Sequence, residues 1–134
     1  MKLYVDTNIF LDYLLERKNK QGKDISAPAQ KLFHRAISCE FFIVFSEHTA
    51  TELANNIDLT KTTFLFETLK KKLVAIGVTK EDKKQAHELS NRNYPDALHA
   101  ILARKSGSDY LITRNLKDFN DFSRIIQSKL PENI

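Results

Sequence analysis

Residues 2–15 read KLYVDTNIFLDYLL, and this stretch predicts how the fold begins. Residues 3–5 are apolar and are expected to form a short buried strand, and the apolar run that starts at Ile9 is expected to continue as a helix to Arg17. The triplet Asp6-Thr7-Asn8 lies on the seam between these two elements. Aspartate is almost never fully buried unless it has a partner, so a carboxylate at this seam needs a specific reason.

The composition limits the class of protein. The chain has 134 residues, 42% of them hydrophobic, which suits one domain covering residues 1–134. The formal charge of +4 and the sequence pI of about 9.2 suit a polyanionic partner such as nucleic acid, and equally suit solvated lysines on an ordinary domain. The single Cys39 excludes an internal disulfide framework and fits a cytoplasmic location. Neither a membrane span of roughly 20 apolar residues nor a signal peptide is recognisable, so no membrane association is expected.

The rest of the chain alternates strands and helices. Further strands are predicted at residues 41–45, 73–78 and 110–113, with a short edge strand at 124–127. Helices are predicted after the capping residue Ser46 and at residues 28–38, 60–72, 80–90 and 95–105, with a polar loop at 19–26. This alternation indicates an α/β fold with a mostly parallel central sheet of four to five strands flanked by helices. Sites in such sheets form outside the carboxyl ends of the strands, which is where Asp6 lies.

Three other acids have comparable positions relative to the predicted strands. Glu52 lies in the helix after the second strand, Asp96 lies on the first turn of the helix at 95–105, and Asp118 follows the late strand. The helix that carries Asp96 is apolar nearly all round and is expected to pack in the interior. A favourable interaction with the helix dipole is the alternative explanation for Asp96.

The periodicity of its helix does not support Glu52. The apolar stripe of this helix is formed by Ala50, Leu53, Ala54 and Ile57. At about 100° per residue, Glu52 falls well off the centre of that stripe. Periodicity alone therefore makes Glu52 an ordinary exposed glutamate, and Glu47 on the first turn competes with it.

Several other side chains near these positions have more than one interpretation. His99 lies about one helical turn from Asp96 and within reach of the site, but the four histidines show no metal-ligand spacing. Asp12 and Glu16 are expected on a solvated helix face, with Asp12 at most at the rim of the site. Thr113 ends a strand and is expected to orient a carboxylate or a water.

A cluster of carboxylates needs a counter-charge at neutral pH, because like charges raise one another's pKa. Carboxylate oxygens without a cysteine pattern suit Mg²⁺ or Mn²⁺ rather than a structural zinc. Such ions activate a water and neutralise charge on a phosphate under attack. A basic chain with an acidic pocket is therefore consistent with the hydrolysis of nucleic acid.

Three segments, in this order, resemble the PIN-domain nucleases. They are YVDTNIFLD at 4–12, SEHTATEL at 46–53 and YPDALHAILARKSGSDYLITRNLKDF at 94–119, and together they cover almost the whole chain. The resemblance implies a PIN-like α/β domain with an acidic, metal-binding pocket. Position by position, it implies catalytic and metal-binding roles for Asp6, Glu52 and Asp96, with Asn8 as a supporting residue. The family pattern therefore favours Glu52 where periodicity does not.

The fourth acid departs from the family pattern. Many members carry aspartate two residues after the threonine of the last strand, where this chain has Asn115. Asp118, just before Phe119, resembles a family variant and is the nearest replacement, whereas Asp121 is a more distant one. The resemblance thus implies Asp118 as the fourth catalytic and metal-binding acid, with Thr113 and Asn115 in support. The departure leaves open whether one metal ion or two are bound.

The resemblance also implies an activity and partners. It implies an endoribonuclease that uses Mg²⁺ or Mn²⁺, in many relatives the VapC-type toxin of a toxin–antitoxin pair. A small antitoxin protein would then insert a segment into the acidic groove, and a homodimer is the common assembly. Arg114 and Lys117 flank the fourth acid and are candidates to hold RNA phosphates, or are solvated loop charges.

Two other classes of protein compete with this prediction. A degraded nuclease fold that binds RNA or a protein without cleavage is supported by Asn115 and opposed by the three intact acids. Phosphatases of the haloacid dehalogenase type need a second acid two residues after the first, where this chain has Asn8. A dinucleotide fold is excluded, because no glycine-rich loop follows the first strand.

Overall fold

The computed structural model describes all 134 residues and contains one five-stranded parallel sheet, as the sequence predicts. The strands are β1 (Lys2–Val5), β2 (Phe42–Ser46), β3 (Leu73–Ile76), β4 (Tyr110–Ile112) and β5 (Ser128–Lys129). Their order is β3-β2-β1-β4-β5, and every neighbouring pair is parallel. The chain builds outward from β1 on one side and then continues with β4 on the other side. The strand order therefore reverses between β1 and β4, and in sheets of this kind ligands bind outside the carboxyl ends of the strands at such a reversal, a place called the crevice below.

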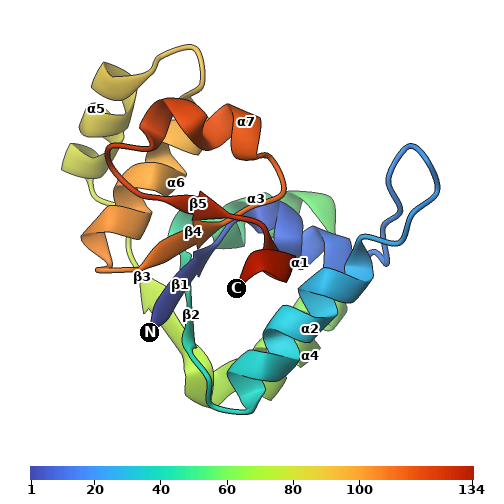
Figure 1. Ribbon diagram of the computed structural model, residues 1–134. Coiled ribbons are helices and arrows are strands. Elements are labelled where there is room, and N and C mark those ends of the chain that lie inside the picture. The colour runs from blue at the N-terminus through green and yellow to red at the C-terminus, as the bar shows by residue number, and fades with distance from the viewer.

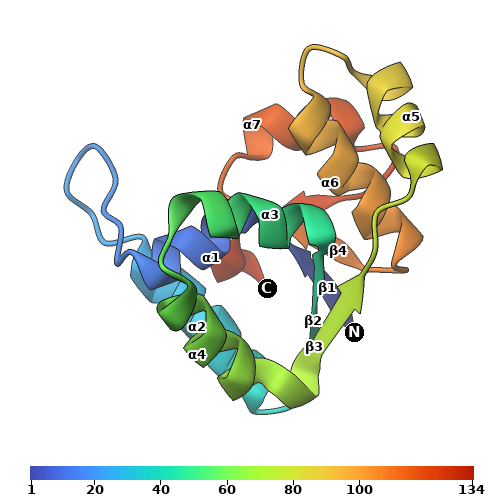
Figure 2. The same ribbon diagram turned by 180° about the vertical axis from the view of Figure 1, so that it is seen from behind.

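Seven helices cover the two faces of the sheet (Figures 1 and 2). They are α1 (Thr7–Leu14), α2 (Ser26–Ile37), α3 (Glu47–Asn56), α4 (Leu59–Leu69), α5 (Lys80–Leu89), α6 (Tyr94–Lys105) and α7 (Leu116–Phe119). Helices α1, α2 and α4 lie on one side of the sheet, and α5, α6 and α7 lie on the other.

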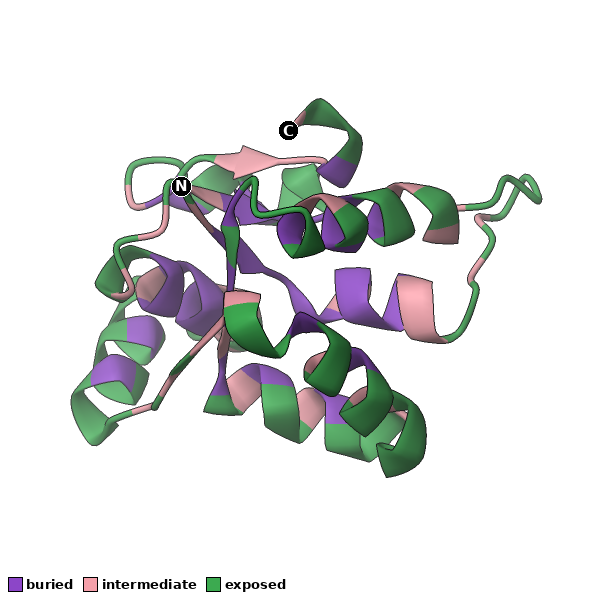
Figure 3. Cartoon of the chain, turned by 90° about the horizontal axis from the view of Figure 1, so that it is seen from below, coloured by how far each residue is buried: buried purple, intermediate pink, exposed green.

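The core has two halves because alternate residues of a strand point to opposite faces. Leu3 and Val5 of β1 belong to the cluster shared with α1, α2 and α4, whereas Tyr4 belongs to the cluster shared with α6. Buried residues accordingly follow the strands and the inner faces of the helices, and exposed residues lie on the outer faces (Figure 3). No helix has both the length and the apolar character needed to cross a bilayer.

Predicted capping residues set two helix starts. The Ser46 hydroxyl accepts a hydrogen bond from the Thr49 amide at 3.2 Å and caps α3. Thr79 and Asp82 form a reciprocal capping box at the start of α5. These caps fix where the chain turns after β2 and after β3, next to the carboxyl edge of the sheet.

The edge strand predicted at 124–127 is wrong. The amides of Ile125 and Ile126 both donate to the Phe122 carbonyl, so this segment is a turn that buries Ile126 against α6 and α7. The fifth strand follows at Ser128–Lys129 and pairs with β4. Tight turns of this kind are not visible in an apolar pattern alone.

The apolar stripe predicted to face the core from α3 is right at Leu53 and Ile57 and wrong at Ala50 and Ala54. Thr49 and Leu53 are buried, whereas Ala50 and Ala54 are exposed and line an open groove toward α4. The helix rests on the end of the sheet through the face that carries Thr49 and Leu53. That rotation moves Glu52 toward the crevice instead of toward solvent.

The predicted loop after α1 reaches away from the body of the molecule (Figure 1). An isolated bridge joins Lys18 to Asp24 at its base. The Asn19 side chain accepts hydrogen bonds from the amides of Gln21 and Lys23, which closes the turn.

Candidate active site

The four predicted acids lie on segments that meet at the carboxyl edge of the sheet. Asp6 directly follows β1 at the start of α1, Glu52 lies on α3, Asp96 on the first turn of α6, and Asp118 on α7. The charge of Glu52 acts on Asp6, and the charges of Asp6 and Asp118 act on Asp96. The fold thus brings together residues that are far apart in sequence.

Asp6 is the most enclosed of these acids, with 3% of its surface exposed. Its backbone amide donates to the Ile112 carbonyl at 2.9 Å, which continues the β1–β4 pairing. The Thr113 hydroxyl donates to Asp6 Oδ2 at 2.9 Å, and in turn accepts from the Asn115 amide at 3.0 Å. Thr113 therefore orients the carboxylate, as its place at a strand end predicts.

His99 lies at the centre of the site, although the sequence identified it only as a residue within reach. Its Nε2 lies 2.8 Å from Glu52 Oε1, and its Nδ1 lies 2.8 Å from the Tyr4 hydroxyl. The Tyr4 hydroxyl is also 2.8 Å from Ser46 Oγ. The Thr7 hydroxyl donates to Glu52 Oε1 at 2.6 Å. A continuous hydrogen-bonded chain therefore connects β1, β2, α3 and α6.

Electrostatics identify His99 as the internal cation of the site. Burial alone would lower the pKa of His99, but Tyr4, the hydrogen bond to Glu52 and the negative charges of the two nearby carboxylates raise it to about 10. Burial would raise the pKa of Glu52, but the hydrogen bond and charge of His99, with the Thr7 hydroxyl, lower it to about 2. Both groups are therefore charged at neutral pH and form a largely buried ion pair.

One cation does not balance the remaining acids. Burial raises the pKa of Asp6 above its usual value, and the charge of Glu52 adds to this, although His99 and Thr113 act in the opposite direction. Burial also raises the pKa of Asp96, and the charges of Asp6 and Asp118 raise it further. The pocket thus has an excess of negative charge near Asp6, Asp96 and Asp118.

This excess fits a divalent cation held by carboxylate oxygens. His48 also supports a bound cation, because its Nε2 atom is buried, has no hydrogen-bond partner and lies 3.6 Å from Glu52 Oε1. Burial and the charge of His99 lower the pKa of His48, so its ring is neutral and an acceptor is available.

A second candidate metal centre consists of His48, Glu52 and His99, whose ligand atoms lie within 4.8 Å of one another. His99 does not fit the role of a ligand there. Its two ring nitrogens are taken by Tyr4 and Glu52, and the ring is protonated. A metal ion bound there would have to replace the hydrogen bond between His99 and Glu52, whereas Asp6, Asp96 and Asp118 offer carboxylate oxygens without that exchange.

The predicted supporting residues have varied positions. Asn8 accepts a hydrogen bond from Arg17 Nη1 at 3.3 Å through its side-chain oxygen. Asn115 and Lys117 are exposed at the start of α7, where Asp118 is also exposed. Arg114 is engaged by acids, with Nε 3.3 Å from Asp12 Oδ2 and Nη1 3.4 Å from Glu132 Oε2.

The solvated position predicted for Asp12 is wrong. The residue is 2% exposed, and it pairs with Arg114 and with Arg17 Nη1, the latter at 3.6 Å. Helix periodicity placed it opposite the apolar stripe, but the turn after β4 covers that face of α1. Glu16 is exposed, as predicted.

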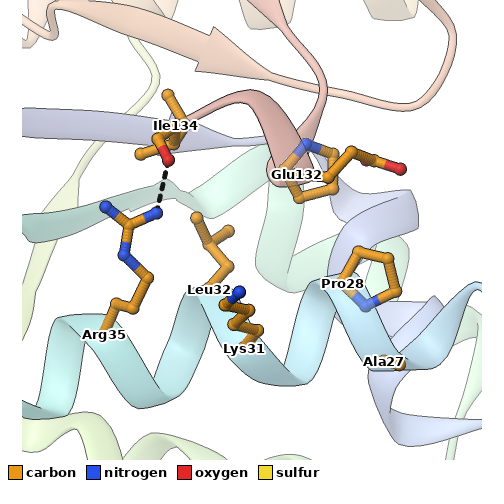
Figure 4. A pocket seen from close by; sticks show the side chains of 8 residues that line it. Ala27, Pro28, Lys31, Leu32, Arg35, Glu132 and Ile134 are labelled. Atoms are coloured by element: carbon orange, nitrogen blue, oxygen red, sulfur yellow. Dashed lines mark hydrogen bonds between the residues drawn. The ribbon is translucent and has the colours of Figure 1, made fainter.

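A cleft of about 300 Å³ lies away from this site, between α2 and the C-terminal turn Pro131–Asn133 (Figure 4). Arg35 on α2 donates to the Ile134 carbonyl across it. None of the four candidate acids lines this cleft. The C-terminal turn packs against α2 at this cleft. The crevice between β1 and β4 therefore remains the candidate active site.

Comparison with known proteins agrees with this fold. A chain of a toxin–antitoxin complex from Klebsiella pneumoniae is 20% identical with a TM-score of 0.66, over 96% of this chain and 97% of that chain. A chain of VapBC2 from Rickettsia felis, bound to a DNA fragment from its promoter, is 17% identical with a TM-score of 0.62, over 97% and 98% of the two chains. VapC20 of Mycobacterium tuberculosis, a toxin that cleaves the sarcin–ricin loop, is 20% identical with a TM-score of 0.57, over 81% and 86%.

Identities this low show a shared fold and no more. Among curated proteins the sequence has no significant match. The family model described as PIN domain matches residues 2–117, a range that holds three of the four candidate acids and ends just before Asp118. With a match over most of its length and the corresponding α/β sheet, the chain belongs to the PIN domain family.

Proposed function

We propose that this protein is a metal-dependent endoribonuclease that hydrolyses RNA phosphodiester bonds. The observation that carries the proposal is the charge balance of the crevice, in which several carboxylates converge on one internal cation, His99. A structural neighbour from a toxin–antitoxin complex and a neighbour that is a sarcin–ricin loop cleaving toxin support the same class of activity.

Asp6, Asp96 and Asp118 are the residues that would hold Mg²⁺ or Mn²⁺, with Glu52 offering its second carboxylate oxygen. When bound, such an ion lowers the pKa of a water and neutralises charge on the phosphate. These donors are carboxylate oxygens, with the free His48 Nε2 near Glu52, and oxygen donors favour these two ions over softer metals.

The chain's own residues have positioning tasks in this proposal. Thr113 holds the Asp6 carboxylate in one orientation, and His99 with Thr7 holds Glu52. Lys117 is exposed beside Asp118 and is available to contact a neighbouring RNA phosphate. Arg114 has a weaker claim to that role, because two carboxylates already engage its guanidinium.

The proposal includes a role as the toxin of a toxin–antitoxin pair. Its support is that two of the structural neighbours come from such complexes. A small antitoxin protein that presents a cation to the acidic crevice is the expected partner, and a homodimer stays a prediction. A binding-only PIN domain is the alternative, and Asn115 at the usual fourth position favours it.

Cleavage of a mixed RNA pool tests the proposal. Purified wild type is assayed with Mg²⁺, with Mn²⁺ and with a chelator, beside Asp6→Asn and the control Asp82→Asn, which removes a carboxylate paired with Lys105 outside the crevice. We expect metal-dependent cleavage by wild type and the control, and a loss of about 100-fold or more in Asp6→Asn. Cleavage that persists in chelator would indicate a contaminant, and no cleavage under any metal would favour the binding-only alternative.

A further inference from the structure

Asp12 is a buried carboxylate that neither the metal site nor the RNA contacts require. It lies on α1, the helix that begins beside Asp6, and its side chain is 3% exposed. An aspartate this deeply buried needs partners that offset its desolvation. Its partners are two arginines that approach from different segments of the chain.

Arg114 is the first partner. It donates from Nε to Asp12 Oδ2 at 3.3 Å, and its Nη2 atom is buried and has no hydrogen-bond partner. Its outer nitrogen, Nη1, reaches Glu132 on the C-terminal turn at 3.4 Å. Asp12 is thus the inner anchor of this guanidinium, and Glu132 is the outer, more exposed one.

Arg17 is the second partner, from the segment that follows α1. Its Nη1 lies 3.6 Å from Asp12 Oδ1 and donates to the Asn8 side chain at 3.3 Å. Asn8 is two residues from Asp6, so this contact ties the first turn of α1 to the same buried charge.

The pairing of Arg114 with Asp12 matters for the site because of where Arg114 lies in the chain. It lies between Thr113, which donates to Asp6, and Asn115, whose amide donates to Thr113. These three residues form the turn from β4 into α7, the helix that carries Asp118. A guanidinium fixed on Asp12 therefore restrains the turn that orients one acid and presents another.

We infer that Asp12 is a positioning residue for the acidic crevice, which it holds in register by anchoring Arg114 and, through it, the turn at residues 113–115. The inference rests on the proposed function for its effect on catalysis. In this inference Arg114 ties the turn to Asp12, and it does not make the RNA contact that its basic charge suggests.

The test compares Asp12→Asn with Asp82→Asn. Both remove a largely buried, ion-paired carboxylate by the same substitution, but Asp82 lies on α5, and its partner Lys105 lies roughly 13 Å along α6 from Asp96. The first readout is amide hydrogen exchange over residues 112–118, which does not depend on activity. We expect exchange at Asn115 to be about tenfold faster in Asp12→Asn and unchanged in Asp82→Asn.

The second readout is the split between kcat and KM for RNA cleavage. Asp12→Asn is expected to lower kcat about 10- to 100-fold with little change in KM, as loss of an orienting partner does. If Asp12→Asn does not fold, Arg114→Gln removes the other end of the tether and should give the same pattern. A raised KM with unchanged kcat in Arg114→Gln would instead identify an RNA contact and overturn the inference.

The two readouts separate the two claims. Should wild type cleave no RNA, the proposed function fails, and the exchange measurement still decides whether Asp12 restrains the turn. Equal exchange at 112–118 in wild type and Asp12→Asn, with only a lower melting temperature, would show that Asp12 merely stabilises the fold.

Discussion

His99 lies between two carboxylates and a phenol, and each of its ring nitrogens has a partner. Its positive charge allows Glu52 to stay ionised inside the molecule and partly offsets the charge of Asp6. Both of its ring nitrogens already have hydrogen-bond partners, Tyr4 and Glu52. At the scale of single residues, the site therefore depends on one histidine that positions the acids. The negative charges of the acids outnumber the single positive charge of that histidine.

Replacing His99 with Gln should destabilise the protein. The amide keeps a polar side chain but removes the charge, so Glu52 and Asp6 lose their counter-ion in a buried site. Loss of one partner of a buried pair typically costs about 3 kcal/mol or more. Urea unfolding at pH 7 measures the difference, and a loss within the error of the measurement would show that His99 is uncharged in the folded protein.

Replacing Asp96 with Asn should have opposite effects on stability and activity. The raised pKa of Asp96 means that its charge is unfavourable in the folded state at neutral pH. The amide removes that charge, so the metal-free protein should gain about 0.5 kcal/mol at pH 7, and the gain should shrink as pH falls and Asp96 itself becomes protonated. Cleavage should fall about 100-fold or more. Urea unfolding with chelator present measures the stability change, and a cleavage assay measures the loss of activity. If the stability of the variant relative to wild type were lower at pH 7 than at pH 5, the predicted stability change would be contradicted.

At the residue level, local signals predict where several candidate residues lie. Asp6 and Thr113 follow from their places at strand ends, and Asp96 from the start of an apolar helix. Glu52 came only from the family pattern, because the rotation of α3 is set by packing and its apolar stripe is misleading. The partners of His99 and Asp12 come from segments that are distant in sequence, so periodicity could not reveal them.

At the scale of elements, α5 and α6 form a pair whose contacts lie outside the candidate site. The capping box of Thr79 and Asp82 begins α5, and Lys105 at the end of α6 donates to Asp82 Oδ2 at 2.7 Å. Ala86 and Leu98 bury the contact between the two helices in the second half of the core. The ion pair between Asp82 and Lys105 thus closes the helix pair at the end of α6 that is remote from Asp96.

The stability of this helix pair should depend on pH in a defined window. Burial would raise the pKa of Asp82, but the Lys105 hydrogen bond and the Thr79 contacts lower it below 3.8. The folded state thus binds fewer protons than the unfolded state near pH 4, so the contribution of Asp82 is present above that pH and is lost as pH falls through the lowered pKa. Wild type should exceed Asp82→Asn by about 1 kcal/mol at pH 7 and by less below pH 4. A gap in unfolding free energy that stays constant from pH 7 to pH 3 would refute this assignment.

Most element types were predictable, but the place of the fifth strand was not. The strands and helices followed from apolar period and from caps such as Ser46 and Thr79. The fifth strand was misplaced at 124–127, because the turn onto Phe122 uses backbone contacts that any apolar pair could make. The local sequence determines which segments form strands and helices. The position of the last strand depends instead on which backbone groups of β4 remain free to pair.

At the scale of the whole molecule, the strand order places the crevice. The reversal between β1 and β4 opens the carboxyl edge, and α1, α3, α6 and α7 each deliver one acid to it. The sheet itself was predictable from strand–helix alternation, and its order was not. The central claim that follows is that a divalent ion held in this crevice acts on the phosphate that is cleaved.

Sulfur substitution of the cleaved phosphate tests that claim most directly. One non-bridging oxygen at a cleavage site found with the mixed RNA pool is replaced by sulfur, and single-turnover rates are measured with Mg²⁺ and with Mn²⁺. Because Mg²⁺ prefers oxygen and Mn²⁺ accepts sulfur more readily, we predict that one of the two sulfur isomers is cut about tenfold more slowly, or worse, in Mg²⁺ and that Mn²⁺ restores its rate. Asp96→Asn should show no such restoration. Equal rates for the oxygen and both sulfur substrates in Mg²⁺, at a chemistry-limited step, would contradict a metal ion that contacts the phosphate in this crevice.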